Sequence, residues 1–311
     1  MRTRATLFFV LSLALLFSSC CCVGGAGSDG ERYKNEFEKS YAVRAPARVI
    51  VSNIDGFVHV DSWDRNEVSV KGAVSLKAKN EKEAQKLMKE INVIITHEDQ
   101  LVSVKVERKK RQGLSQLFHL PSDWRVDLQL MVPKECDVSA SSVDGALRAS
   151  GLKGTHKLST VDGAIEARDI DGRVECRTVD GSCYLSNVRG TVEARTTDGG
   201  IRIDGILTGL KASTVDGSIR VAALEGSAVA EKWRISGVSG SINLAVPGSM
   251  SADLDARTVD GHISIDVPSL VGTISQRKVS AKLGKGGNPV SISTTDGSIS
   301  VKLIDAKKEE A

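Results

Sequence analysis

The hydrophobic and polar positions of this chain repeat with a short, strict period between Ser142 and Glu231. The segment divides into ten consecutive nine-residue units, and glycine stands fourth in nine of them. Alternate units resemble one another more closely than neighbouring units do, so the full period is eighteen residues. A fixed short period indicates a repeat architecture, in which each unit stacks on its own copy.

Each odd unit carries apolar residues at its sixth and eighth places, for example Ile165 and Ala167. This period of two predicts a β-strand with one face turned inward. An Asp-Gly pair precedes the strand, and glycine accepts the positive φ of a tight corner. We therefore predict structural corners at Asp144 and Gly145, Asp162 and Gly163, Asp180 and Gly181, Asp198 and Gly199, Asp216 and Gly217, Asp260 and Gly261, and Asp296 and Gly297.

Two folds fit these units. Asp-Gly also forms hairpin turns, so a β-meander is the alternative. Strict copying favours a coil, because only there does each residue stack on its own copy about 4.8 Å away. We predict an all-β fold, a β-solenoid (β-helix) with about eighteen residues per coil over residues 134–304. Beyond Thr214 the motif recurs after 23, 21 and 36 residues. We expect the first two steps to contain loops, one at Glu231–Ile235, and the last to span two coils.

Residues 47–133 are expected to form a degenerate N-terminal β region. Ala47–Val60 contains a first strand, Asp-Gly, strand copy. Residues 80–91 change to a helical period, with a capping pattern at Asn80 and Glu83, and predict one short helix covering the end of the sheet. Ile91–Val106 predicts a hairpin. Arg108–Trp124 combines basic and apolar residues, which suits either a solvated loop or a contact loop for an anionic surface.

The chain begins with Arg2 and Arg4 followed by a short apolar run, which predicts a secretory signal peptide over residues 1–19. Phe17-Ser-Ser-Cys20 resembles the bacterial lipobox, which implies lipidation at Cys20. Cys21 or Cys22 is an alternative acceptor, and ordinary secretion or a retained anchor are alternative fates. Residues 20–46 are expected to be the acylated Cys and a flexible tether, and residues 305–311 a charged tail.

Composition narrows the function classes. The 311 residues carry a formal charge of +3, and removal of Arg2 and Arg4 would bring it closer to neutrality, so we predict no nucleic-acid partner. Only 4% of residues are aromatic, which suits thin stacked coils. Of six cysteines, three stand at the lipobox. We expect Cys136, Cys176 and Cys183 to be free buried thiols, with a bridge between Cys176 and Cys183 as the alternative.

No catalytic constellation is evident in the sequence. The five histidines share no metal-ligand spacing, and His156 falls on an inward place, so we expect it in the core. Each corner aspartate is expected to bond its own turn as an Asx-turn, with weak cation uptake by the stacked carboxylates as the alternative. The threonines are expected to bond one another along the sheet. We predict no catalytic residues, no metal site and no cofactor.

The tandem TVDGxI units, as at Thr160, Thr178, Thr214, Thr258 and Thr294, follow a lipobox and a β region with one helix. This order resembles the adhesin-like family of bacterial envelope proteins, a domain of unknown function. The resemblance implies a β-strand-repeat fold and an envelope role. We expect a non-enzymatic binding or structural module, held to a membrane by its N-terminal lipid on the periplasmic or surface face, with an envelope protein or glycan as partner. The alternative is a carbohydrate-active β-helix enzyme.

Overall fold

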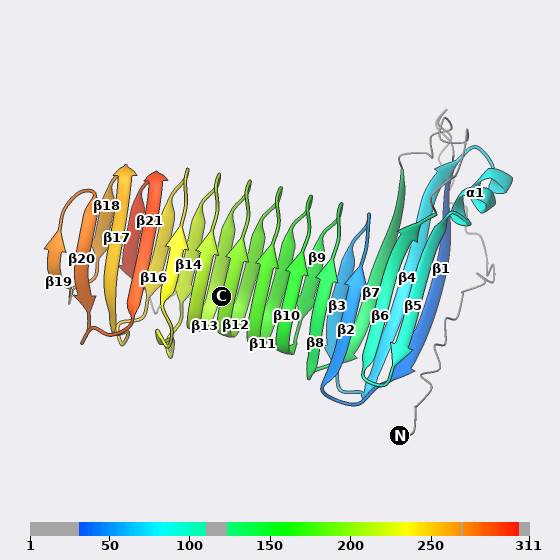
Figure 1. The fold of residues 1–311 in the computed structure, drawn as a ribbon, viewed down its shortest axis with the longest axis horizontal. Coiled ribbons are helices and arrows are strands. Elements are labelled where there is room, and N and C mark those ends of the chain that lie inside the picture. The colour runs from blue at the N-terminus through cyan, green and yellow to red at the C-terminus, as the bar shows by residue number, and fades with distance from the viewer. Residues whose placement is uncertain (1–30, 110–122, 269, 305–311) are drawn as a thin grey trace, which may run out of the picture. The chain divides into compact units, whose positions relative to one another are not determined.

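The computed structural model describes residues 31–109, 123–268 and 270–304. The chain divides into two compact units, Met1–Gly145 (unit 1) and Ala146–Ala311 (unit 2). Apart from one helix, all the regular secondary structure of the described residues is β-strand, which confirms the all-β prediction (Figure 1). The signal peptide, Cys20 and the charged tail lie outside the described residues, as does most of the loop at Arg108–Trp124.

Unit 1 contains two rows of paired strands. One row runs β1 (Glu31–Ala42), β4 (Glu67–Ala78), β7 (Trp124–Pro133) and β3 (Val58–Trp63), with β1, β4 and β7 antiparallel and β3 parallel to β7. The other runs β5 (Ile91–Glu98), β6 (Leu101–Arg108), β2 (Ala47–Ser52) and β8 (Cys136–Ser141). Alternate residues are buried along these strands, which builds a valine- and leucine-rich core.

Two expectations for unit 1 need correction. The tether over residues 20–46 ends earlier than expected, because residues 31–42 form strand β1 and pair with β4 over its whole length. The helix α1 (Glu81–Met88) begins as predicted, with Asn80 accepting a hydrogen bond from the Glu83 backbone N–H. It packs against β4, but the edge of β4 that faces away from β7 is covered by β1 and not by the helix. Strand pairing satisfies that edge's backbone groups, which a helix cannot do.

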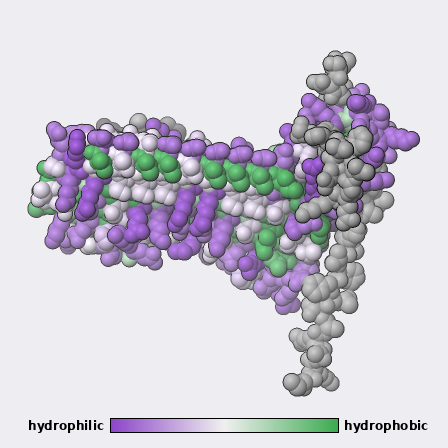
Figure 2. Space-filling view, turned by 45° about the horizontal axis from the view of Figure 1, so that its top comes forward, coloured by the Kyte–Doolittle hydropathy of each residue, from purple (hydrophilic) through white to green (hydrophobic). Residues whose placement is uncertain are grey.

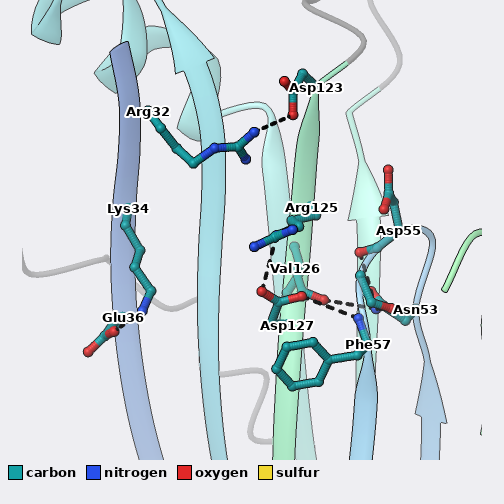
Figure 3. Close-up of polar contacts among 11 residues, drawn as sticks. Arg32, Lys34, Glu36, Asn53, Asp55, Phe57, Asp123, Arg125, Val126 and Asp127 are labelled. Carbon is teal, nitrogen blue, oxygen red and sulfur yellow. Dashed lines mark hydrogen bonds and ion pairs between the residues drawn. The ribbon is translucent and has the colours of Figure 1, made fainter. Parts of the chain in front are cut away.

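Asn53 stands in the first copy of the corner where later copies have threonine, and it is 3% exposed. Its side-chain amide donates to the backbone oxygens of Asp55, Gly56 and Val126 at 3.2, 3.1 and 2.9 Å (Figure 3). The last of these bonds ties the corner to β7, 73 residues away in sequence. A single buried amide therefore joins two strands that the sequence pattern alone does not pair.

We expect Asn53→Ala to lower the free energy of unfolding by about 1–3 kcal/mol, because buried carbonyl groups lose their donor. Urea unfolding followed by circular dichroism measures the change. Asn92→Ala on β5 is the matched control, since no side-chain hydrogen bond of Asn92 occurs among the described residues. Equal stability of the two variants would contradict a structural role for the Asn53 amide.

Unit 2 is a β-solenoid over its first coils. Long bent strands β11 (Ile165–Arg177), β12 (Cys183–Arg195) and β13 (Ile201–Ser213) pair in parallel, and Ile165, Cys183 and Ile201 stand in one column at the predicted step of eighteen. β9 (Leu147–Ser150) and β10 (Lys153–Ser159) precede them and pair with β11. The predicted solenoid start at residue 134 lies in unit 1, since the chain divides into compact units after Gly145.

The next coil consists of β14 (Ile219–Ala223) and β15 (Trp233–Ser236), and β16 (Ile242–Val246) stacks on β14 one coil later. The loop expected at Glu231–Ile235 lies earlier. Trp233 and Ile235 belong to β15 and are fully buried, and residues 224–232 connect the strands. Burial of the large apolar surface of the Trp233 indole stabilises this coil. The side chain therefore lies in the core and not in an exposed loop.

The last coils do not follow chain order. β21 (Pro289–Asp296) lies between β15 and β17 (Ala252–Asp260), and β22 (Ile299–Leu303) lies between β16 and β18 (Ile263–Asp266). β20 (Lys278–Leu283) pairs antiparallel with both β17 and β19 (Val271–Ile274). The step of 36 residues is therefore not two successive coils: Thr294 pairs directly with Thr258. The C-terminal strands fill a gap between two earlier coils.

Candidate functional site

Most corners of unit 2 read Thr-Val-Asp-Gly, and the four residues differ in burial and in hydrogen bonding. Thr178 is 6% exposed, and its hydroxyl lies 3.3 Å from the Val161 carbonyl oxygen and 3.2 Å from that of Gly163, one coil earlier. Thr196 and Thr214 make the same contacts to their preceding coils. The threonines thus bond backbone carbonyls of the previous coil and not one another, which corrects the expectation of a threonine ladder.

The corner aspartates do not form Asx-turns. Their backbone N–H groups bond the previous coil, as Asp180 does to Val161 at 2.9 Å, but within the described residues the Asp162, Asp180, Asp198 and Asp216 carboxylates accept no hydrogen bond. The prediction failed because the threonine hydroxyl and the strand ladder already satisfy the corner backbone. The carboxylates are exposed to solvent and perform no visible structural task.

The corner glycines are required mainly by stacking. A Cβ added to Gly181 would lie 2.1 Å from the Gly163 carbonyl oxygen, and one added to Gly199 would lie 2.1 Å from that of Gly181. Gly163 and Gly217 have the predicted positive φ, 151° and 149°. Gly181 does not, since its φ lies outside the left-handed region, so the prediction was wrong there. Close approach of successive coils explains Gly181, Gly199 and Gly217, each of whose added Cβ would lie 2.1 Å from a carbonyl oxygen of the preceding coil.

A second bend lies inside each of the long strands β11 and β12, and the residues that form it were not predicted. Asp169 and Asn187 have φ of 54° and 51°, and the Asn187 side-chain amide donates to the Asp169 carboxylate of the preceding coil. Gly151 occupies the same column with φ of 69°. Glycine, aspartate and asparagine are the residues that tolerate this conformation, so their recurrence in one column was the available signal.

A row of exposed valines follows the corners of unit 2. The row and the polar residues that flank it are named the corner ridge. The row is Val161, Val179, Thr197, Val215, Val238, Thr295 and Val259, and the flanking residues are Asp162, Asp180, Asp198, Asp216, Ser239, Asp296 and Asp260. The five valines are 42–62% exposed. Figure 2 brings this edge forward and shows hydrophobic surface bordered by hydrophilic side chains. The ridge recurs at seven successive corners of unit 2.

A family model described as Toastrack DUF4097 matches residues 54–302, which include both the first Asp-Gly corner and the whole corner ridge. The chain belongs to the Toastrack DUF4097 family. This assignment confirms the resemblance to an adhesin-like domain of unknown function and the β-solenoid-like fold. The Toastrack match covers most of the chain and extends over both units.

Three solved structures are similar to this Toastrack protein, each at 12% identity and over 87% of this chain. They are a putative cell adhesion protein from Clostridium sporogenes (100% of that chain, TM-score 0.25), a putative lipid binding protein from Parabacteroides distasonis (97%, 0.46) and a putative adhesin from Bacteroides fragilis (97%, 0.38). No curated protein matches. The family assignment rests on the family model alone.

Stacked corner carboxylates affect one another. In unit 1, Asp55 and Asp144 occupy neighbouring coils, joined by a backbone bridge. Burial and, after it, the Asp144 carboxylate raise the pKa of Asp55 above its ordinary value. Like charges held at the spacing of neighbouring strands repel, and more strongly where water is partly excluded. At this first pair of corners, burial and the neighbouring carboxylate therefore both oppose ionisation of Asp55.

Along β9–β13 the charged residues form ion-pair ladders. Glu193, for example, lies within 2.8 Å of Arg195 and 3.5 Å of Arg177. A cavity beside Gly209 includes Glu175 and Glu193 but holds only about 20 Å³. That is room for about one water and not for a sugar flanked by two carboxyl groups. The carbohydrate-active alternative finds no support in this part of the Toastrack fold.

Within the described residues, no group of three or more His, Cys, Asp or Glu side chains is arranged to hold a metal ion. His156 is fully buried, which confirms its predicted place in the core. Among the described residues, no helix is both long enough and apolar enough to cross a bilayer.

The three described cysteines are free and buried, as expected. Burial raises the pKa of Cys183 to about 12 and that of Cys136, beside Asp137, also to about 12. Burial also raises the pKa of Cys176 well above its ordinary value. Since the thiolate is the reactive form, these thiols should be inert in the folded protein.

We expect the full-length chain with Cys20, Cys21 and Cys22 replaced by serine to show no reactive thiol when folded and three when denatured without reductant. Titration with a thiol reagent at pH 8 measures both states. One reactive thiol in the denatured protein would contradict the prediction, because it would mean that Cys176 and Cys183 are bridged.

Proposed function

We propose that this Toastrack protein is a non-enzymatic, adhesin-like binding module of the bacterial cell envelope, lipid-anchored through Cys20, and that the corner ridge is its recognition surface. The observation that carries the proposal is the row of exposed valines. Isolated exposed apolar residues are ordinary, but a regular row of valines along one edge, interrupted only at Thr197 and Thr295, supports an interaction site.

The valines are not needed for the fold. Thr197 and Thr295 occupy the same column, are exposed, and leave the coil spacing and backbone pairing unchanged. Threonine has the same β-branched shape and a comparable strand preference, so a chain selected only for folding and solubility would have no reason to prefer valine here. Retention of valine at five corners supports a role in contact with another molecule.

The partner that fits the ridge best is an envelope protein with apolar and basic side chains. Apolar groups would cover the valines, and basic groups would neutralise carboxylates that accept no hydrogen bond within the described residues. A neutral glycan would satisfy neither row. The ridge therefore supports a protein partner over the glycan alternative.

The ridge is tested by cross-linking in intact cells. A photoreactive amino acid at position 179 should capture a partner, whereas the same amino acid at position 189, on the opposite bend of the same coil, should not. A triple variant, Val161, Val179 and Val215 each to threonine, should keep its melting temperature and lose the cross-link from position 238. Cross-links of equal yield from positions 179 and 189 would remove the ridge as the recognition surface.

The anchor is tested separately by fatty-acid labelling. The wild-type protein should incorporate labelled palmitate and partition into detergent, because each buried CH₂ contributes about 0.8 kcal/mol to membrane binding. Replacement of Cys20, Cys21 and Cys22 together by serine should abolish both. Continued labelling of the triple variant would exclude lipidation at this site without affecting the argument for the ridge.

A further inference from the structure

One coil of unit 2 departs from the corner sequence in two positions. Where the other corners have Thr-Val-Asp-Gly or Thr-Thr-Asp-Gly, this one reads Gly237-Val-Ser239-Gly240. It has lost a threonine side chain and a carboxylate. Because β21 inserts beside this coil, the altered corner lies next to Thr294 and Asp296 of the C-terminal strands.

Gly237 is not required by the backbone or by packing. Its φ lies outside the left-handed region, and an added Cβ would meet its nearest neighbour, the Thr294 hydroxyl oxygen, at 3.5 Å. That is an ordinary van der Waals distance, in contrast to 2.1 Å at Gly181 or Gly199. A larger residue would fit, so the glycine keeps a space open instead of solving a stacking problem.

The space is part of a hollow of about 450 Å³, lined by Gly237, Arg257, Arg277, Lys278, Ser293 and Thr295 among others. Its volume falls within the range of roughly 300–1,000 Å³ typical of small-molecule sites. Three cationic side chains line it and no carboxylate does. The hollow lies beside the otherwise acidic corner ridge, at the coil where serine replaces aspartate.

The three cations differ in what holds them. Asp255 fixes the Arg257 guanidinium through bonds from Nε at 2.8 Å and Nη2 at 2.9 Å, which orients its remaining N–H groups. Arg277 is 3.9 Å from Asp260, at the limit of a direct ion pair. Lys278 forms no ion pair among the described residues, so its charge is the one left uncompensated.

We propose that this hollow, the cationic hollow, binds an oxyanion, phosphate or carboxylate, carried on a sugar or other polyol. Arg257 and Lys278 supply charge-assisted donors for the anion. The exposed hydroxyls of Ser293 and Thr295 supply partners for ligand hydroxyl groups. The hollow shares Val259 and Thr295 with the corner ridge, but the argument for it rests on the cations and on Gly237 and not on the proposed function.

The test uses the full-length protein in detergent and ligand-observed NMR, with glucose 6-phosphate, glucuronate, inorganic phosphate and glucose as probes. Glucose 6-phosphate and glucuronate should bind, inorganic phosphate more weakly, and glucose not at all. A synthetic poly(glycerol phosphate) distinguishes the source of the ligand: tighter binding per phosphate indicates an envelope polymer, and equal binding indicates a free small molecule. No binding of either charged sugar at about 20 mM, well above a Kd of about 1 mM, would overturn the proposal.

Two variants that restore the chain's own repeat make the test specific. Gly237→Thr fills the space and Ser239→Asp returns the carboxylate, and both should fold because every other corner of unit 2 carries a larger residue or a carboxylate at these places. Both variants should weaken the binding of glucose 6-phosphate about fivefold or more. Lys278→Gln should weaken the binding to a similar extent, whereas Lys278→Arg should bind as the wild type does. The triple valine-to-threonine variant of the ridge should bind normally. Wild-type affinity in folded Gly237→Thr and Lys278→Gln would refute the site.

Discussion

Replacing Gly181 with valine should prevent unit 2 from folding or lower its free energy of unfolding by more than about 3 kcal/mol. The Cβ of any residue at this position would lie 2.1 Å from the Gly163 carbonyl oxygen and 2.7 Å from its carbonyl carbon. Both atoms are backbone, so relief requires separation of two coils whose strands hydrogen-bond along their length. Gly181→Ala should show the same effect in a smaller but still large measure.

The adjacent pair Gly199 and Gly200 gives the sharpest control. An added Cβ at Gly199 would lie 2.1 Å from the Gly181 carbonyl oxygen, whereas one at Gly200 would meet nothing nearer than the Ser218 carbonyl oxygen at 3.6 Å. In thermal and urea unfolding, the stability of Gly199→Ala should be far below that of the wild type. The stability of Gly200→Ala should be close to that of the wild type. Similar stability of the two variants would show that stacking of the coils is looser than the glycine column requires.

The second large effect concerns the order of the C-terminal coils. Ile299 in β22 pairs with Ile242 on one side and Ile263 on the other, and it is fully buried. Ile263 in β18 pairs with Ile299 alone and is 4% exposed. Ile299→Ala should therefore lower the free energy of unfolding by about 2–5 kcal/mol, and Ile263→Ala by clearly less.

A solenoid built in chain order predicts the opposite ranking, because Ile299 would then belong to the last coil. Truncation after Asn288 extends the comparison. If the coils followed chain order, this truncation would remove only the last coil. In this structure it removes β21 from between β15 and β17, and β22 from between β16 and β18. We expect loss of the cooperative unfolding transition of unit 2 on truncation. A truncated protein that unfolds cooperatively at nearly the wild-type urea midpoint would contradict the inserted order.

The sequence alone was sufficient for the repeat and its period. Eighteen-residue copying of Ile165, Cys183 and Ile201 predicted one column of parallel strands, and the structure has that column. The capped helix after Asn80 and the inward places of His156 and Cys176 were equally readable. These features depend on residues close in sequence or on strict copies of one another, so periodicity and local propensity determine them.

Only the tertiary structure decided the order of the C-terminal strands and which corner residues hold neighbouring coils together. Strands β21 and β22 resemble every other repeat, so their pattern suits any position along the coil, and the gap that they fill exists only once the earlier coils have formed. The corner aspartate looked structural, but the threonine hydroxyl bonds the preceding coil and leaves the carboxylate exposed. Gly237 and Lys278 stand 41 positions apart, and only the inserted strands bring them to one hollow. Sequence period specifies which face of a strand is buried, whereas the choice of neighbouring strand depends on long-range pairing among nearly identical edges.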